Sequence, residues 1–329
     1  MMTTDELIRS ELEKFPEIPT MTLAKKLYKE HPALFKNLEA CRCMIRYRRG
    51  NHGVKSRGEA KKNHSETFRE NGEAGWTIPK SISKEKKPFK LSNGKWLILS
   101  DVHIPYHDEE SLETALQYGE DEGIDHILLN GDICDFFSIS RWMKNPEERN
   151  LSQELQMTRQ FLGHLRGRFP NARIVYKIGN HEDRWEIYMF TKAPEIVGVS
   201  NFEMRSLLDF SRFGVEEVTT KQMIKAGKNL TIIHGHEKFG GSGVNPARGL
   251  YNQMKVCSIM GHHHQSSSHA EKTADDKFVA CWSIGCLCEL HPDYAPINKW
   301  NHGFAILDLD GNDFNMNNLR IVNGKVNHL

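Results

Sequence analysis

Residues 96–103, WLILSDVH, place a short apolar run directly before an aspartate and a histidine. Four further blocks also follow apolar runs and supply metal-binding residue types: Gly131–Asp132, Gly179–Glu182, His234–His236 and Gly261–His264. Such runs predict buried β-strands, and strand ends that converge on one edge of a sheet are where an α/β fold places its chemistry. The five blocks therefore predict an α/β fold with one shared site.

The residue types in these blocks indicate a metal site. They supply carboxylates, an amide and imidazoles, a mixture suited to Mn, Fe, Zn or Ni. Any single block could instead be a turn with a buried histidine, and His262–His264 could be a solvated histidine tract. Side chains two apart on an extended segment point the same way, so we expect His262 and His264 to act together and His263 to point elsewhere. Five blocks in this order favour the metal site.

The series Asp-x-His, Gly-Asp-x-x-Asp, Gly-Asn-His-Glu, His-Gly-His and Gly-His-x-His resembles the calcineurin-like metallophosphoesterases, over about residues 95–310. The resemblance implies a four-layer α/β/β/α sandwich that holds two divalent metal ions at the sheet edge. It implies metal-dependent phosphoester hydrolysis, with Mn²⁺ expected and Fe, Zn or Ni as alternatives. Two cations about 3.5–4 Å apart offset the repulsion between hydroxide and an anionic phosphodiester.

The resemblance also implies roles for single residues. The implied metal ligands are Asp101, His103, Asp132, Asn180, His234, His262 and His264. The first cation would take Asp101, His103 and His264, the second would take Asn180, His234 and His262, and Asp132 would bridge them through its two oxygens. His181 would be the acid that protonates the leaving oxygen when a metal-bridging hydroxide attacks, and histidine suits that role near pH 7.

One departure from the family narrows the expected substrate. Protein phosphatases of this superfamily carry an arginine directly after Gly-Asp-x-x-Asp, whereas Phe136 and Phe137 follow Asp135 in this chain. This departure disfavours a protein phosphatase. Arg184 is a candidate phosphate clamp, because a guanidinium forks onto phosphate oxygens; a salt bridge on a helix face is the alternative. We expect Asp135 to support the site by hydrogen bonding.

Composition is typical of a soluble protein. The 329 residues are 38% hydrophobic and 26% charged, and no run of 18 apolar residues predicts a membrane-spanning helix. The acidic start at residues 1–6 has no apolar stretch typical of a secretory signal. Seven irregularly spaced cysteines indicate reduced thiols, and we interpret Cys281, Cys286 and Cys288 as buried core thiols. We therefore expect a cytoplasmic protein, from a bacterium or a phage-infected cell, with no membrane partner.

Charge and composition divide the chain into three parts. Residues 1–90 carry 20 basic and 12 acidic residues, whereas the remainder has a net charge of −7. We predict a small all-α, helix-turn-helix-like domain over 1–52, a basic linker over 53–92 and a phosphoesterase domain over 93–329. A basic N-terminal part joined to an acidic remainder suggests a module that binds a polyanion, for which nucleic acid is the leading candidate.

The first domain is expected to contain helices over about 4–15, 22–31 and 37–49. On the third helix, Arg42, Arg46 and Arg49 share a face at spacings of four and three, opposite an apolar face. This pattern resembles a helix-turn-helix module that contacts DNA or RNA. The alternative is a small helical bundle with a solvated basic face.

Three functions are consistent with these patterns. The leading hypothesis is a two-metal phosphodiesterase or nuclease that acts on nucleic acid. The second is a phosphatase or phosphodiesterase for a small nucleotide. The third is a nucleic-acid-binding regulator whose phosphoesterase domain serves as a scaffold, and the intact set of ligand types argues against it.

Overall fold

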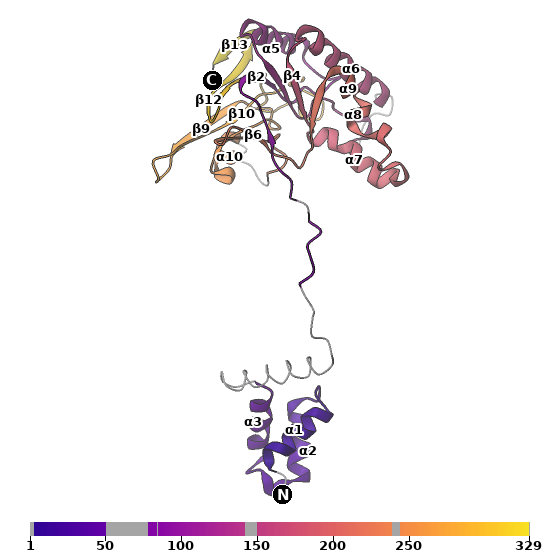
Figure 1. Ribbon diagram of the computed structural model, residues 1–329, viewed down its shortest axis with the longest axis vertical. Helices are drawn as coiled ribbons and strands as arrows, with labels where there is room; N and C mark the ends of the chain where they lie inside the picture. Colours follow the sequence, from indigo (N-terminus) through magenta and orange to yellow (C-terminus); the bar gives the residue numbers. More distant parts are fainter. Residues whose placement is uncertain (1–2, 51–77, 84, 142–149, 239–243, 329) are drawn as a thin grey trace. The chain divides into compact units, whose positions relative to one another are not determined.

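The computed structural model describes residues 3–50, 78–83, 85–141, 150–238 and 244–328. The chain divides into two compact units, Met1–Ser83 and Lys84–Leu329 (Figure 1). Much of the expected linker lies outside the described residues. The second unit includes residues before the expected start at 93, because strand β1 (Phe89–Lys90) pairs in parallel with strand β6 (Ile224–Ala226). Among the described residues no helix is long and apolar enough to cross a membrane.

The first unit is helical, as the sequence predicts. It contains α1 (Thr4–Lys14), α2 (Thr20–Glu30), a short 3-10 turn (Pro32–Leu34) and α3 (Leu38–Arg48). Thr3 and Glu6 form a reciprocal cap at the start of α1, and Asn37 accepts a hydrogen bond from Ala40 N at 2.7 Å at the start of α3. Buried apolar side chains from all three helices form its core.

Two β-sheets form the centre of the second unit. The seven-stranded sheet has the order β13-β12-β11-β2-β3-β4-β5, and the six-stranded sheet has the order β1-β6-β7-β8-β10-β9. The strands of the first sheet are β2 (Gly94–Leu99), β3 (His126–Asn130), β4 (Arg173–Lys177), β5 (Val215–Val218), β11 (Gly303–Asp310), β12 (Asp313–Val322) and β13 (Lys325–His328). The second adds β7 (Leu230–Ile232), β8 (Cys257–Met260), β9 (Ser267–Lys272) and β10 (Phe278–Ser283).

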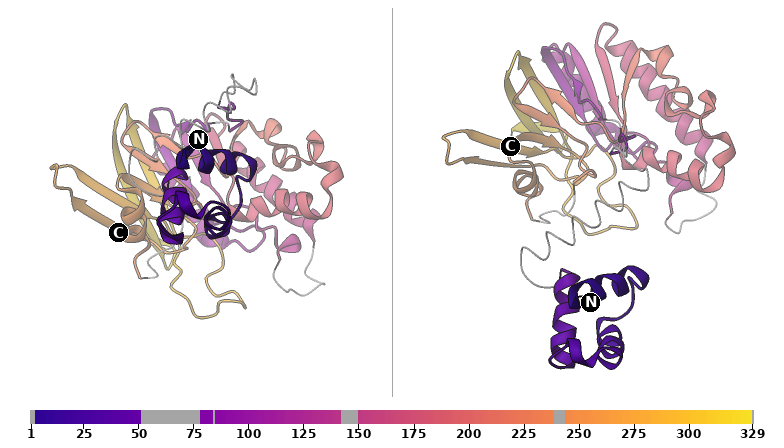
Figure 2. Two further views of the ribbon diagram at one scale, coloured as in Figure 1. Left: turned by 90° about the horizontal axis from the view of Figure 1, so that it is seen from below. Right: turned by 60° about the horizontal axis from the view of Figure 1, so that its bottom comes forward.

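Helices cover the outer faces of both sheets (Figures 1 and 2). The longer helices are α5 (Glu109–Asp121), α6 (Leu151–Arg168), α7 (Asn180–Lys192) and α10 (Pro246–Met254). The shorter ones are α8 (Met204–Leu207) and α9 (Phe210–Phe213), with 3-10 turns at Phe137–Ile139, Pro194–Ile196 and Ser200–Phe202. α5 and α6 pack on the seven-stranded sheet, and α10 packs on β8 and β10.

The alternation of side chains along β2 shows how one strand serves two cores. Leu97 and Leu99 pack beneath α5 and α6, whereas Trp96 and Ile98 lie between the two sheets. All four side chains are fully buried. This arrangement of helix, sheet, sheet and helix confirms the four-layer sandwich that the sequence predicts.

Candidate metal centre

All five blocks follow strand ends, and several of their residues adopt an unusual backbone conformation. Strands β2, β3, β4, β7 and β8 end one or two residues before their blocks. Asp101, His103, Asp132, His262 and His264 all have positive φ angles, between 53° and 66°. Non-glycine residues rarely adopt this conformation, and such strain clusters at functional sites. The fold therefore uses strained turns to aim these side chains.

The structure brings Asp101, His103 and His264 together as the sequence predicts. His264 Nε2 lies 3.2 Å from His103 Nε2 and 3.2 Å from Asp101 Oδ1. Asp132 Oδ2 lies 4.0 Å from His103 Nε2. All four side chains are buried, and imidazole nitrogens and carboxylate oxygens that meet this closely are the donor set of a divalent cation.

A second group shares the same oxygen of Asp132. His234 Nε2 lies 3.1 Å from Asp132 Oδ2 and 3.2 Å from Asn180 Oδ1. Ligand atoms of Asp132, His234 and His262 lie within 4.8 Å of one another. His234 Nδ1 donates to the carbonyl of Asn130 at 2.7 Å, which leaves Nε2 as the ligating nitrogen. Two adjoining nitrogen and oxygen groups that meet at one carboxylate fit a pair of divalent cations.

Asp135 orients two histidines through their Nδ1 atoms. Its Oδ1 lies 2.7 Å from His103 Nδ1 and 2.9 Å from His181 Nδ1. These contacts place the Nε2 atoms of both rings toward Asp132. Asp135 thus supports the site by hydrogen bonding, which is the role that the sequence predicts.

His181 and Arg184 lie together beside the shared carboxylate. His181 Nε2 is 3.8 Å from Asp132 Oδ2 and accepts a hydrogen bond from Arg184 Nη2 at 2.9 Å. Burial lowers the pKa of His181, but the charge of Asp132 and the hydrogen bond to Asp135 outweigh burial, so the pKa is raised. Arg184 also donates to the carbonyl oxygen of Asp135 at 2.9 Å. Its guanidinium is therefore at the candidate site, and its nearest carboxylate, Asp135, belongs to the site as well.

Glu182 holds the loop that carries Asp132, a role that sequence reasoning missed. Its buried carboxylate accepts backbone N–H groups of Asp132, Ile133 and Cys134 at 3.0, 2.7 and 3.0 Å. Tyr176 Oη donates to it at 2.7 Å. The glutamate of the Gly-Asn-His-Glu block was visible in the sequence, but the three backbone N–H groups that it binds lie 48 to 50 residues away.

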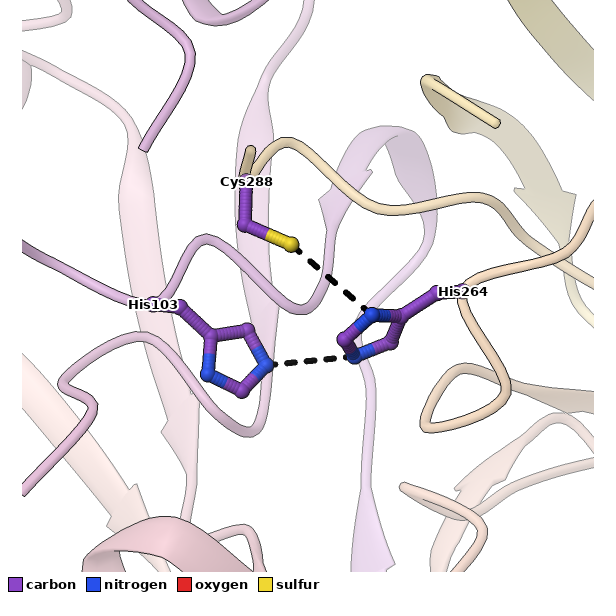
Figure 3. A group of neighbouring side chains, drawn as sticks. All are labelled: His103, His264 and Cys288. Carbon is purple, nitrogen blue, oxygen red and sulfur yellow. Dashed lines mark hydrogen bonds between the residues drawn. The ribbon is translucent and has the colours of Figure 1, made fainter. Parts of the chain in front are cut away.

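Sequence reasoning also missed two neighbours of His264. Cys288 is buried as expected, yet its sulfur lies 3.8 Å from His264 Nδ1, and with His103 these side chains form a third group of ligand types (Figure 3). The Trp300 ring lies 4.1 Å from the His264 ring, centroid to centroid. Cys288 and Trp300 both lie in the connection between β10 and β11. Their distance from His264 along the chain follows no motif that could have revealed the contact.

The three arginines of the predicted basic face lie in the other unit and differ from one another. Arg42 pairs with Glu39 at 3.2 Å on the same helix. Arg49 donates to Thr20 Oγ1 at 3.0 Å and to the carbonyls of Pro16 and Ile18. Arg49 therefore stabilises the connection between α1 and α2, whereas Arg42 and Arg46 are partly exposed on α3.

Known proteins share this chain's sequence pattern. A family model described as Calcineurin-like phosphoesterase matches residues 94–282. The "Gene 54 protein" of Mycobacterium phage L5 is 31% identical over 245 residues, which cover 70% of this chain and 94% of that protein. The "Gene 54 protein" of Mycobacterium phage D29 is 28% identical over 245 residues, with the same two coverages.

Two solved structures are among those similar to this chain. Vacuolar Protein Sorting 29 from Cryptosporidium parvum gives a TM-score of 0.40 at 16% identity, over 72% of this chain and 97% of that one. Yfce, a phosphoesterase from E. coli, gives a TM-score of 0.35 at 13% identity, over 71% and 98%. The family match spans more than half of this chain and contains all five blocks in order. The chain therefore belongs to the calcineurin-like phosphoesterase family and is a metal-dependent phosphoesterase.

Proposed function

We propose that this enzyme is a two-metal phosphodiesterase or nuclease that cleaves nucleic acid. The observation that carries the proposal is the pair of ligand groups that share Asp132 Oδ2, with His181 and Arg184 beside it. The absence of an arginine after Asp135 favours a diester over a protein phosphomonoester, and the basic first unit favours a nucleic-acid substrate. Both phage relatives support a site of action in the cytoplasm of an infected cell.

One cation would be held by Asp101, His103 and His264. The other would be held by Asn180, His234 and His262, and Asp132 would bind both cations. Two divalent cations there would neutralise the phosphate, lower the pKa of a water and hold the attacking and leaving oxygens in line. Mn²⁺ is the expected metal for these imidazole, carboxylate and amide donors, with Fe, Zn or Ni as alternatives.

His181 and Arg184 would act on the leaving-group proton and on the negative charge of the phosphate. His181 Nε2 now accepts a hydrogen bond from Arg184, so it cannot hold a proton in that direction. A phosphate oxygen is a stronger acceptor for a guanidinium than an imidazole is. A bound diester would therefore draw Arg184 to its phosphate oxygens, and His181, held by Asp135 through Nδ1, would then take up a proton on Nε2 for the leaving oxygen.

Metal binding is expected to release about two protons per chain at pH 7.5. Burial disfavours the charged imidazolium, but Asp132 raises the pKa of His234 to about 10, and Asp101 raises that of His264 to about 9. Burial lowers the pKa of His262 to about 3. Before a cation binds, His234 and His264 are thus protonated below pH 9, and each must lose its proton to become a ligand.

Calorimetry of Mn²⁺ binding in buffers with different ionisation enthalpies measures this release directly. Affinity should fall as the pH is lowered below about 9, and the release should fade as the pH rises toward about 10. Binding at pH 7.5 without proton release would show that these two histidines are not the ligands.

Removing the basic face of α3 should weaken nucleic-acid binding without affecting the metal centre. The double change Arg42→Ala with Arg46→Ala should reduce the slope of log affinity against log salt by about one unit per lost phosphate contact. Arg49 is left in place because it bonds to Thr20 and to backbone carbonyls within the unit. Binding is measured by titration of labelled DNA and RNA at several salt concentrations.

Two controls interpret this experiment. Arg9→Ala removes one positive charge from α1, where Arg9 pairs with Asp5 at 3.2 Å, and should leave the slope unchanged. A chain that begins after Ser83 should lose the nucleic-acid-binding module but still hydrolyse a small chromogenic ester. If the double variant and the shortened chain bind nucleic acid like the parent, the first unit serves another partner.

A substrate panel tests the function as a whole. The Mn²⁺-reconstituted enzyme is given single-stranded DNA, duplex DNA, RNA, cyclic nucleotides and an aryl phosphomonoester. Cleavage of the polymers supports the proposal. A preference for cyclic nucleotides or the monoester would favour the small-nucleotide enzyme, and binding without cleavage would favour a regulator with a scaffold domain.

A further inference from the structure

The connection between β10 and β11 runs along the edge of the metal centre. It is fixed at both ends to segments that carry candidate ligands: Asn301 N donates to the carbonyl of His264 at 2.9 Å, and Glu289 N donates to the carbonyl of Tyr106 at 2.9 Å. Tyr106 N in turn donates to the carbonyl of His103 at 2.6 Å. In Figure 2 the phosphoesterase unit is turned so that this edge comes forward.

The connection is also tied together internally. Asn298 Nδ2 donates to the carbonyls of Leu290 and Ala295, the latter at 2.8 Å, and Asn298 Oδ1 accepts from Trp300 N at 2.8 Å. His291 Nδ1 contacts the carbonyl of Pro296 at 3.2 Å. A loop with its own hydrogen-bond network holds its side chains in place before a ligand arrives, which reduces the entropy lost on binding.

Aromatic rings on this loop lead from a metal ligand to solvent. Trp300 packs edge-on against the His264 ring at 4.1 Å, and Tyr294 packs edge-on against Trp300 at 6.2 Å, centroid to centroid. Tyr294 is 74% exposed, so its ring is open to a ligand that arrives from solvent. A second edge-on pair, Tyr106 and Phe137 at 5.6 Å, lies just after the His103 and Asp135 segments.

We propose that Tyr294, backed by Trp300, is a stacking subsite for a nucleobase of the substrate. The inference rests on the proposed function and adds to it a preference for unpaired strands, because a base offers its face to an aromatic side chain only when it leaves the duplex stack. A base is the fitting occupant, since it is a planar ring that arrives attached to the phosphate held at the metals. Arg184 beside His181 would take the phosphate charge, and Tyr294 would take the base.

The test compares Tyr294→Ala with the parent on two esters that share a leaving group: the p-nitrophenyl ester of thymidine 5′-phosphate and methyl p-nitrophenyl phosphate. The kcat/KM for the thymidine ester should fall about 5- to 100-fold, as expected for one base–aromatic stack, while the methyl ester should be unaffected. Tyr294→Phe keeps an aromatic ring and should retain the parent's kcat/KM for the thymidine ester. Ile297→Ala, on the same loop and 95% exposed, is the matched control and should change neither.

Inhibition gives a second measurement. Thymidine 5′-phosphate should inhibit the parent more strongly than inorganic phosphate does, and Tyr294→Ala should remove that advantage. An equal fall on both esters would assign the ring to the leaving group, and no fall on either would leave it without a substrate role; both overturn the subsite. Cleavage of single-stranded DNA by the parent is scored separately, so the subsite can fail while the proposed function stands.

Discussion

Asp132→Asn is expected to abolish measurable hydrolysis and to weaken both cations. Asp132 Oδ2 faces His103 and His234, one from each ligand group, so a single substitution removes the charge that the two positions share. Two-metal charge stabilisation contributes several kcal/mol, and each 1.4 kcal/mol is tenfold, so the rate should fall by at least about 10³-fold. Metal content per chain, measured by mass spectrometry after dialysis, should fall in parallel.

Asparagine is the right replacement at this position. Asp132 has a φ of 53°, a conformation that asparagine adopts more readily than most residues, so the turn should persist. Asp310→Asn, at an exposed position at the end of β11, makes the same chemical change away from the site and should behave like the parent. If Asp132→Asn kept two metals per chain and near-normal turnover, Asp132 would not be the bridging ligand.

His181→Ala is expected to lower turnover on a nucleic-acid diester by about 10²–10⁴-fold while metal content stays near normal. The reason is that His181 Nε2 faces Asp132 from beside the two ligand groups and is assigned the proton for the leaving oxygen. His181 also lies within ligand range of His103 and Asp132, so metal content is the measurement that separates the two roles. His181→Asn retains a donor toward Asp135 and should show the same loss.

The loss caused by His181→Ala should depend on the leaving group, and the pH dependence of the rate should change. An aryl leaving group needs no protonation, so the loss on an aryl ester should be much smaller than on the diester. The pKa of His181 is raised in the folded protein, so the parent's rate on the diester should decline as the pH rises through that pKa. The variant should lack this decline. Equal losses on both esters, or an unchanged pH profile, would assign the leaving-group proton to another residue.

The helical first unit shows where pattern reasoning works and where it stops. Apolar spacing and the caps at Thr3 and Asn37 are local features, so the helices could be read from the sequence. Which arginines of α3 remain available on its surface could not be read from the sequence. Arg49 shares a helical face with Arg42 and Arg46, but its guanidinium bonds to the connection between α1 and α2, a contact 29–33 residues away in the chain.

The family and the residue types of the metal centre could be read from the sequence alone, because each donor block is a short segment that follows its own apolar run. The four-layer sandwich was implied by the family resemblance that the five blocks carry. Which face of β2 packs beneath the helices could not be read from the sequence, because Trp96, Leu97, Ile98 and Leu99 are all apolar and both faces are buried.

Only the tertiary structure decided which atoms meet. That one oxygen of Asp132 faces both groups, that Glu182 secures the loop of Asp132, and that Cys288 and Trp300 contact His264 all depend on how two sheets pack. These contacts join residues from 24 positions apart, for His264 and Cys288, to 102 positions apart, for Asp132 and His234. Their distances are set by the packing of strands and turns rather than by local spacing, and for this reason no pattern in the chain could have revealed them.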